Sequence, residues 1–392
     1  MSYDAIVIGA GPAGCSAALA LAGMGRRVAI VEQSRFPRKK VCGEYMSAVN
    51  LDLLDRLGAG ASVRARAGPS VRRVALFASG PAVEAGMPRA PGDAFGCALG
   101  RDVLDSVLLQ AATDAGAAVF QPWRAVDVCA GGAAAAVRIE SAGESRVLTA
   151  DAVIAAHGSW ARGPLASQLE RKNRRQDFFG FKAHFRGASL ARDLMPLLVF
   201  PGGYGGMVWA DQGRLSLSCC LRRDALARVR DLYRAPAAQA VFAHIRASCP
   251  AARIALGGAA LDGAWLAAGP IRPGVRACYA ADIFRVGNIA GECHPIIAEG
   301  IAMALQSGWL LACALARHDV WDARSRAAAG RDYSEAWRRQ FSTRIAAGAV
   351  LARLAILPQT AGAMQAVVRA LPSSLSFGAR LSGKTRAVPE CR

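Results

Sequence analysis

The feature that most constrains the fold of this 392-residue chain is a glycine-rich turn between an apolar strand and a helix. Residues 4–9 form a short apolar run, typical of a strand buried on both faces of a parallel sheet. The run enters the motif Gly-Ala-Gly-Pro-Ala-Gly at 9–14, and a helical stretch follows at 15–25. A second strand at 27–31 ends at Glu32. This order predicts a Rossmann-like unit that binds a dinucleotide.

Each glycine of the motif has a distinct role in such a unit. Gly9 permits the tight turn, Gly11 lets the backbone approach a pyrophosphate, and Gly14 lets the helix pack closely on the strand. The free N–H groups and the positive end of the helix dipole then face the phosphates. Glu32 stands where a carboxylate accepts hydrogen bonds from ribose hydroxyls, and its charge disfavours a 2′-phosphate. The motif therefore predicts FAD or NAD, and an NAD-dependent dehydrogenase is one interpretation of it.

Three later segments resemble the superfamily of flavoprotein monooxygenases, geranylgeranyl reductases and flavin halogenases. Residues 39–44, Lys-Lys-Val-Cys-Gly-Glu, are similar to the loop that runs beside the flavin in these proteins. Residues 100–105, Gly-Arg-Asp-Val-Leu-Asp, are similar to a helix start whose arginine meets FAD. Residues 286–301 look like the family's Gly-Asp motif, proline loop and following helix. The resemblance implies that the dinucleotide is FAD, with NAD(P)H as a transient reductant.

The motif and the resemblance together predict a set of residues that contact FAD. The helix that starts at Gly300 is expected to direct its N-terminus at the pyrimidine edge of the flavin, where it stabilises the anionic reduced ring. No metal site is expected, because the five histidines and eleven cysteines show no metal-ligand spacing. The predicted FAD-binding residues are Gly9, Gly11, Pro12, Ala13, Gly14, Glu32, Gln33, Lys40, Cys42, Gly43, Arg101, Gly158, Asn288, Pro295, Gly300 and Ile301.

Five polar positions near the expected flavin have open or unusual roles. The family usually has Asp where this chain has Asn288, but an amide can still donate and accept. His157 replaces another family Asp, either as a catalytic base or as a turn residue bonded to backbone. His294 is the first candidate for a general acid or base and Glu44 the second, with a backbone cap as the alternative for His294. Cys42 is either redox-active or a packing residue.

The predicted fold class is α/β, with a discontinuous FAD-binding domain of glutathione-reductase type, a substrate-binding sheet domain and a helical C-terminal region. The sequence alternates at a period near two from 176 to 275, which indicates a mostly antiparallel sheet. In the resembling families this sheet covers the flavin and forms the substrate pocket. The predicted FAD-binding domain comprises 1–70, 98–175 and 276–330, the sheet domain 71–97 and 176–275, and the helical region 331–392.

Charge and cysteine content bear on partners and location. The formal net charge is +19, and nearly all of the positive charge comes from arginine in an alanine- and glycine-rich chain. We therefore attribute the charge to the base composition of the genome and expect no nucleic-acid partner. Contact with an acyl carrier or a membrane surface stays open. The arginine-rich region 331–392 either packs on the FAD domain or forms an amphipathic surface helix. Unpatterned cysteines, no leader and no spanning apolar run predict reduced thiols in a soluble cytoplasmic protein of undetermined oligomeric state.

The chemistry is left mainly to the flavin, because the chain has no nucleophile elbow, P-loop or second dinucleotide motif. The halogenase signature Trp-x-Trp-x-Ile-Pro is absent, and a reductase pocket motif is only faintly echoed at 204–209. Hydroxylation of a hydrophobic molecule through a flavin hydroperoxide is therefore the first prediction, by elimination. Reduction of a C=C bond or dehydrogenation, as in geranylgeranyl reductases, is the alternative. A flavin-bound regulatory or membrane-peripheral protein is the alternative from another class.

Overall fold

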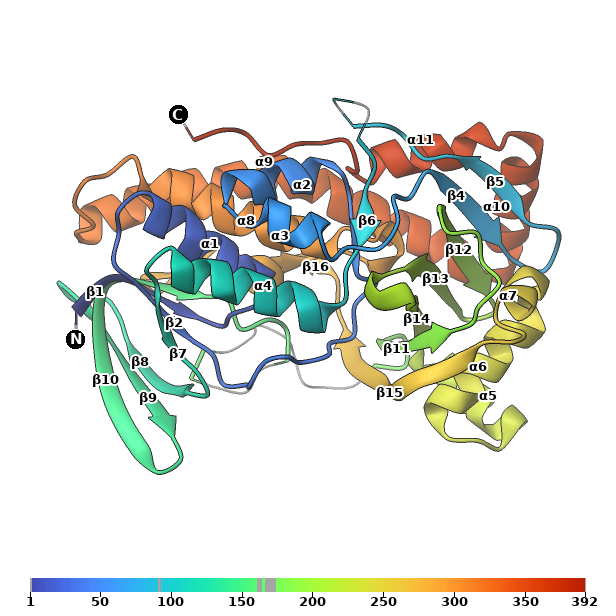
Figure 1. Cartoon of the computed structure of the whole chain (residues 1–392), viewed down its shortest axis with the longest axis horizontal. Coiled ribbons are helices and arrows are strands. Elements are labelled where there is room, and N and C mark those ends of the chain that lie inside the picture. The colour runs from blue at the N-terminus through green and yellow to red at the C-terminus, as the bar shows by residue number, and fades with distance from the viewer. Residues whose placement is uncertain (1, 91, 93, 161–163, 166–173, 392) are drawn as a thin grey trace.

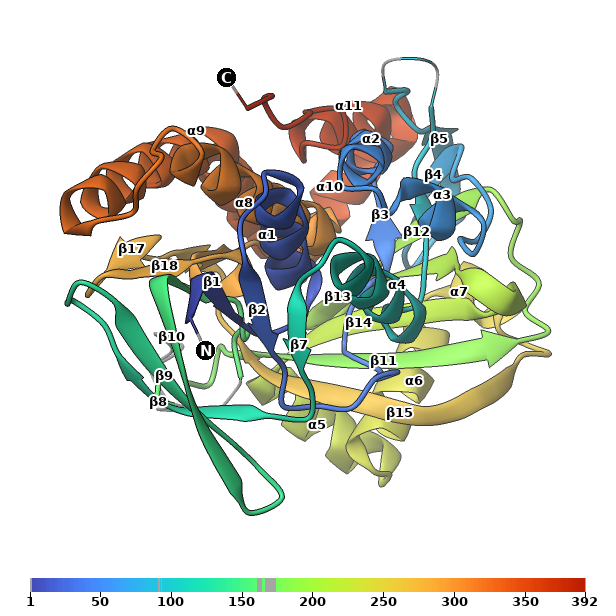
Figure 2. The same cartoon turned by 60° about the vertical axis from the view of Figure 1, so that its left-hand side comes forward.

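The computed structural model describes residues 2–90, 92, 94–160, 164–165 and 174–391. They form two large sheets that lie side by side, with long helices packed along one side of both (Figure 1, Figure 2). Within the predicted segments 71–97 and 98–175, positions 91, 93, 161–163 and 166–173 lie outside the described residues.

The first sheet is centred on β1 (Ser2–Ile8), which pairs in parallel with β10 (Glu144–Ala155) and β2 (Val28–Val31). The strand order is β17-β18-β10-β1-β2-β7, and β8 and β9 extend β10 as antiparallel neighbours. Strands far apart in the sequence therefore share one sheet, as the predicted fold class requires. The remaining strands are β7 (Ala118–Phe120), β8 (Arg124–Cys129), β9 (Ala135–Ser141), β17 (Tyr279–Ala280) and β18 (Ile283–Arg285).

Three helices cover one face of this sheet (Figure 2). They are α1 (Pro12–Gly23), α4 (Arg101–Asp114) and α8 (Gly300–Leu315). Helix α1 begins earlier than the predicted residue 15, because proline is well suited to the first helical turn. Short elements complete this part of the molecule: β3 (Tyr45–Met46) paired with β6 (Cys97–Ala98), β16 (Gly274–Val275) paired with β19 (Gly291–Glu292), α2 (Val49–Arg56), α3 (Gly60–Arg64), and 3-10 turns at Gly287–Ile289 and Pro295–Ile297.

The second sheet has the order β15-β11-β14-β13-β12-β4-β5, and all its pairs are antiparallel except β12 with β4. The mostly antiparallel sheet expected from the alternating sequence is thus present. Three helices pack on its outer face and close a separate core. The elements are β4 (Arg73–Phe77), β5 (Val83–Gly86), β11 (Phe178–Arg186), β12 (Leu194–Phe200), β13 (Gly203–Trp209), β14 (Leu215–Arg222), β15 (Ala260–Ile271), α5 (Arg223–Tyr233), α6 (Ala237–Ser248), α7 (Pro250–Ala255) and a 3-10 turn at Asp211–Gly213.

Strand alternation separates the two faces of the second sheet. On β11, Phe181 and Phe185 belong to the core beneath α5–α7. Lys182 and His184 stand between them in the sequence, so they face the opposite side, toward the first sheet. On β13, Met207 and Trp209 join the same core. One face of this sheet therefore packs against helices α5–α7, and the other face borders the space between the two sheets.

The chain ends in three helices, α9 (Ala323–Ile356), α10 (Pro358–Ala370) and α11 (Ser373–Leu381). This confirms the helical C-terminal region. Helix α9 packs on α8, α10 packs on α9, and α11 packs on α10 and on strands β4 and β5. In Figure 1 these helices, orange to red, run from the first sheet to the far edge of the second. The C-terminal helices therefore bridge the two sheets.

One expectation about the cysteines is wrong. Cys313 on α8 is disulfide-bonded to Cys391 near the C-terminus, with Cα atoms 4.9 Å apart. The tail returns along α8, where the indole N–H of Trp309 donates to the carbonyl of Pro389 at 2.9 Å. The pairing spans 78 residues, and no spacing pattern in the sequence marks it. The nine other cysteines are free thiols.

Among the described helices, none alone is both long and apolar enough to cross a membrane. Helices α9 and α10 pass that test of length and composition only as a pair, and their axes are bent by 103° at the break between them.

Candidate active site

One cavity of about 890 Å³ runs between the two sheets. Pockets that hold small molecules and cofactors usually measure about 300–1,000 Å³. Of the two predicted catalytic residues, Glu44 lines the cavity, whereas His294 is not among the described residues that line it. All but one of the predicted FAD-binding residues line it, the exception being Gly14; the lining ones are Gly9, Gly11, Pro12, Ala13, Glu32, Gln33, Lys40, Cys42, Gly43, Arg101, Gly158, Asn288, Pro295, Gly300 and Ile301.

The glycine turn has two tightly packed positions and one open position. Gly9 has a φ of 112°, and a Cβ built there would lie 2.6 Å from the carbonyl oxygen of Ala156. A Cβ at Gly14 would overlap the carbonyl oxygen of Gly9. At Gly11 the only atom of the described residues within 4 Å of a Cβ would be Nη2 of Arg101, at 3.8 Å. The fold therefore requires Gly9 and Gly14, whereas Gly11 borders the space that a ligand would fill.

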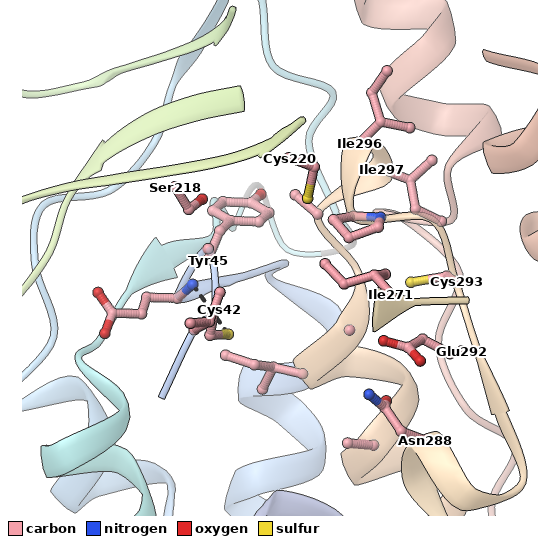
Figure 3. Close-up of a pocket in the computed structure, with 18 of the residues that line it drawn as sticks. Cys42, Tyr45, Ser218, Cys220, Ile271, Asn288, Glu292, Cys293, Ile296 and Ile297 are labelled. Carbon is pink, nitrogen blue, oxygen red and sulfur yellow. Dashed lines mark hydrogen bonds between the residues drawn. The ribbon is translucent and has the colours of Figure 1, made fainter. Parts of the chain in front are cut away.

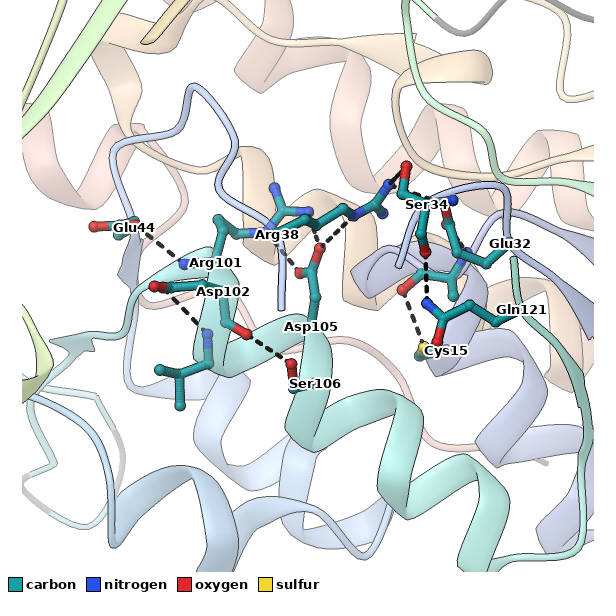
Figure 4. A network of polar contacts seen from close by, with 12 residues as sticks. Cys15, Glu32, Ser34, Arg38, Glu44, Arg101, Asp102, Asp105, Ser106 and Gln121 are labelled. Carbon is teal, nitrogen blue, oxygen red and sulfur yellow. Dashed lines mark hydrogen bonds and ion pairs between the residues drawn. The ribbon is translucent and has the colours of Figure 1, made fainter. Parts of the chain in front are cut away.

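Glu32 is buried at the end of β2 and is held by three donors (Figure 4). Its Oε2 accepts from the backbone N–H of Ala10 at 2.9 Å. Its Oε1 accepts from the backbone N–H of Ser34 at 2.8 Å and from Nη1 of Arg38 at 3.1 Å. Oε2 can still accept a further bond, and Glu32 and Gln33 both line the cavity. The carboxylate thus stands where the dinucleotide motif predicts a contact with ribose.

Three cations gather beside the glycine turn, against two carboxylates. Arg101 donates to Asp105 from Nε at 2.7 Å and from Nη2 at 2.8 Å, and Arg38 lies 3.6 Å from the same carboxylate. Burial lowers the pKa of Arg101, but its contacts with Asp105 raise that pKa more, so it remains charged. Burial, followed by the charges of Arg38 and Arg101, lowers the pKa of Lys40. A bound anion would relieve this repulsion, and the pyrophosphate of FAD fits.

The second helix start opens into the same cavity. Helix α8 begins at Gly300, where a Cβ would meet no atom within 4 Å in the part of the chain that the structure describes. Helices α1 and α8 lie close together. Ser16 Oγ on α1 donates to the carbonyl of Leu305 on α8 at 2.7 Å. A Cβ at Gly308 would lie 2.5 Å from the carbonyl oxygen of Ala13. Two N-terminal helix ends, far apart in the sequence, therefore border one space. This arrangement fits FAD: the start of α1 would hold the diphosphate, and the start of α8 would stabilise charge on the ring.

Glu292 is a buried acid in the cavity that the sequence motifs did not single out (Figure 3). Its Oε2 accepts from Ser159 Oγ at 3.0 Å and lies 3.6 Å from Nη2 of Arg276. Burial raises the pKa of Glu292 more than Arg276 and Ser159 lower it. The sequence does contain a signal for Glu292, because this residue lies within segment 286–301, which resembles the flavin loop of the family.

Tyr204 joins the predicted catalytic histidine to the cavity. Its hydroxyl oxygen lies 2.5 Å from Nδ1 of His294, and the ring of Phe178 packs edge-on against the imidazole. Tyr204 lines the cavity and His294 lies behind it. Burial lowers the pKa of His294 to about 4 and raises that of Tyr204 well above its ordinary value. Near neutral pH the imidazole is therefore uncharged and the phenol is protonated.

Glu44 is fixed by three groups and has a strained backbone, with a φ of 63°. Its carboxylate forms an ion pair with Lys182, lies 2.8 Å from Nε2 of His184, and accepts from the backbone N–H of Arg101 at 3.0 Å. Burial alone would raise the pKa of Glu44, but His184 and Lys182 lower it to about 2. The geometry favours a carboxylate that holds the start of α4 in place. Lys182 and His184 were not predicted, although the alternation of β11 places both on this side.

Both interpretations of His157 and of Cys42 stay open. His157 lines the cavity, and burial lowers its pKa, so an uncharged ring faces the site. Cys42 also lines the cavity, and its sulfur accepts from the backbone N–H of Glu44 at 3.4 Å. This bond is the kind of contact that a packing residue makes in the loop. Across the parts of the chain that the structure describes, no group of three or more His, Cys, Asp or Glu side chains could hold a metal ion.

Beyond the start of α8 the cavity has an apolar section. One wall comes from the inner face of the second sheet, and the other from helices α9, α10 and α11. The side chains that line this section include Leu197, Val208, Leu351, Met364, Val368 and Leu375. A long hydrophobic molecule could therefore reach the flavin site from the side of the C-terminal helices.

Comparison with known proteins places this fold among flavoproteins. Residues 2–240, more than half of the chain, match the family described as FAD binding domain. A menaquinone reductase of Mycolicibacterium smegmatis is 27% identical over 381 residues, which is 90% of this chain and 84% of that protein. A menaquinone reductase of Mycobacterium tuberculosis is 31% identical over 179 residues, but the match spans only 46% of this chain and 43% of that protein.

The fold is also shared with a solved halogenase. The myxobacterial chondrochloren halogenase CndH superimposes with a TM-score of 0.78 and 20% identity, over 97% of this chain and 91% of that one. The predicted superfamily and fold class are thus confirmed, and the interpretation as an NAD-dependent dehydrogenase is set aside. With its glycine turn, buried Glu32 and cation cluster around one cavity, the chain belongs to the FAD binding domain family and is an FAD-dependent oxidoreductase.

Proposed function

We propose that the chain reduces a carbon–carbon double bond of an isoprenoid quinone or a closely related lipid. The observation that carries this proposal is the apolar section of the cavity, which continues from the flavin end to helices α9–α11. A pocket of this kind accommodates a long hydrocarbon better than a compact polar substrate. The similarity of nearly the whole chain to a protein named menaquinone reductase supports the same substrate class.

Reduction of a double bond consumes two electrons and two protons. FAD supplies the electrons when it is bound, and we propose NAD(P)H as the compound that reduces it. Because no second dinucleotide motif is present in the sequence, NAD(P)H would bind only transiently. The chain itself must orient the substrate, exclude water and hold a proton near the reacting bond. The apolar walls perform the first two tasks.

Tyr204 is the group best placed to hold that proton. Tyr204 lines the cavity, and its raised pKa keeps its hydroxyl protonated. If the uncharged His294 carries its proton on Nδ1, it donates to the tyrosine oxygen. The tyrosine proton is then available to a substrate in the cavity, with the neighbouring Cys220 as its other partner. The predicted role of His294 as a general acid or base then becomes one of positioning, with Tyr204 as the catalytic acid.

This proposal reverses the order of the two reactions expected from the sequence. The sequence favours hydroxylation only because the halogenase signature is absent and the reductase signature is faint. The long apolar section and the reductase relative are positive observations, and both favour reduction. Hydroxylation remains the alternative outcome of the experiment below.

The test is an anaerobic reaction of the NAD(P)H-reduced protein with a naphthoquinone that carries two isoprene units. We expect the flavin to be reoxidised and the product to contain two additional hydrogens that persist in air, which separates chain reduction from formation of an air-sensitive quinol. A product with an added oxygen atom, formed only after air is admitted, would establish hydroxylation instead. Absence of turnover with either nicotinamide cofactor would favour the regulatory alternative.

A further inference from the structure

The C-terminal helices expose three pairs of large apolar side chains. The two members of each pair are four residues apart, so each pair occupies one face of its helix end. Their exposed fractions range from 41% to 62%, and these six are among only fourteen such exposed residues in the described chain. We call them the C-terminal apolar surface: Val350 and Leu354 on α9, Val367 and Leu371 at the end of α10, and Phe377 and Leu381 on α11.

The charge around this surface has a single sign. The sequence contains no acidic residue between Glu335 and Glu390. Three exposed arginines lie beside the apolar pairs, Arg353 next to Leu354 in sequence, Arg369 between Val367 and Leu371, and Arg380 next to Leu381. Apolar side chains flanked by arginine, without acids, are the composition that binds the interface of an anionic lipid bilayer.

The same surface borders the cavity. Leu354 and Val367 belong to the C-terminal apolar surface and also line the cavity. Leu351 and Met364, one turn away on the same helices, line it further inside. The rim of the apolar section is therefore made of side chains that are themselves exposed. A lipid that enters here would stay in contact with apolar groups along its path.

We propose that the C-terminal apolar surface lies on an anionic bilayer and that the cavity opens there to a lipid substrate. The helices would insert only to the depth of the headgroup boundary, roughly 5–10 Å. The 103° bend between α9 and α10 and the exposed Arg353 oppose a straight span. The bilayer contact stands on the exposed residues alone, whereas the entry of substrate rests on the proposed function.

The test is flotation of the flavin-loaded protein with vesicles of phosphatidylglycerol and phosphatidylcholine, or of phosphatidylcholine alone. One variant removes the apolar pair on α11, another removes the three arginines beside the apolar pairs, and two variants serve as controls of the same chemistry elsewhere. The surface variants are Phe377→Ser with Leu381→Ser, and Arg353→Gln with Arg369→Gln and Arg380→Gln. The controls are Val147→Ser with Val320→Ser, at exposed positions on β10 and before α9, and Arg138→Gln with Arg146→Gln and Arg317→Gln, whose arginines are also exposed.

We expect the wild-type protein and both controls to float with anionic vesicles. Each surface arginine is expected to contribute about fivefold to binding, so the triple variant should bind roughly a hundredfold less, and the difference should shrink at high salt. The serine variant should bind less at every salt concentration. Wild-type protein that stays with the buffer, or surface variants that float like the controls, would overturn the proposal. Surface variants that instead change a vesicle-independent dimer to a monomer would show that a second copy covers the surface.

Turnover separates this proposal from the proposed function. The surface variants should reduce a naphthoquinone with two isoprene units in buffer as fast as the wild-type protein does, and lose activity only toward a long-chain quinone embedded in vesicles. If no form of the protein reduces any quinone, the proposed function fails, and vesicle flotation still decides whether the surface binds a bilayer.

Discussion

The hydroxyl of Tyr204 lies 2.5 Å from Nδ1 of His294, and of the two side chains only the tyrosine lines the cavity. This relationship makes the proton donor testable. Tyr204→Phe keeps the ring and removes the hydroxyl, so flavin content should be unchanged. We expect flavin reoxidation by the quinone to be about 10²–10⁴ times slower, the usual contribution of a general acid. Stopped-flow absorbance of the flavin measures it, and reoxidation at the wild-type rate would exclude Tyr204 as the acid.

His294 also makes stability depend on pH. Burial lowers its pKa from 6.5 to about 4 in the folded chain. Between these values the unfolded chain binds a proton that the folded chain does not, so the free energy of unfolding falls as pH drops from 6.5 to 4. The loss is about 3 kcal/mol. Because burial also lowers the pKa of His157, His294→Gln keeps part of the pH dependence, and urea unfolding should show that the wild-type protein loses about 3 kcal/mol more than this variant. Parallel pH profiles for the two proteins would contradict the assignment.

The ion pair of Glu44 with Lys182 predicts that the conservative substitution Glu44→Gln strongly lowers the free energy of unfolding. Glu44→Gln keeps the shape of the side chain but leaves the buried ammonium of Lys182 opposite a neutral amide. Breaking one partner of a buried pair costs about 3–5 kcal/mol. Replacing both partners, as Glu44→Gln with Lys182→Met, should restore more than half of the lost free energy of unfolding, measured in urea. Equal instability of the single and double variants would show that Glu44 acts through other contacts.

The sequence predicts the cofactor end of the site better than the substrate end. The cofactor end is built from short sequence motifs, whereas the substrate end depends on contacts between residues far apart in the chain. The turn around Gly11 and the helix start at Gly300 are short motifs whose geometry is local, and the structure places both at one cavity. The contact of Tyr204 with His294 joins residues 90 positions apart, and nothing near either one marks it. The same holds for the disulfide of Cys313. Such contacts depend on how the two sheets and the C-terminal helices pack.

Gly11 and Gly14 differ in what their replacement should do, although one motif contains both. A side chain at Gly11 has space in the protein, and its φ of −75° suits any residue, so Gly11→Asp should fold normally. Its carboxylate would occupy the place of the pyrophosphate, so the purified variant should lack the visible absorbance of flavin. Gly14→Ala should lower the free energy of unfolding, because its Cβ would overlap the carbonyl of Gly9. Flavin content and urea unfolding, measured on both variants, distinguish the two effects. A Gly11→Asp protein with full flavin occupancy would show that FAD does not bind against this turn.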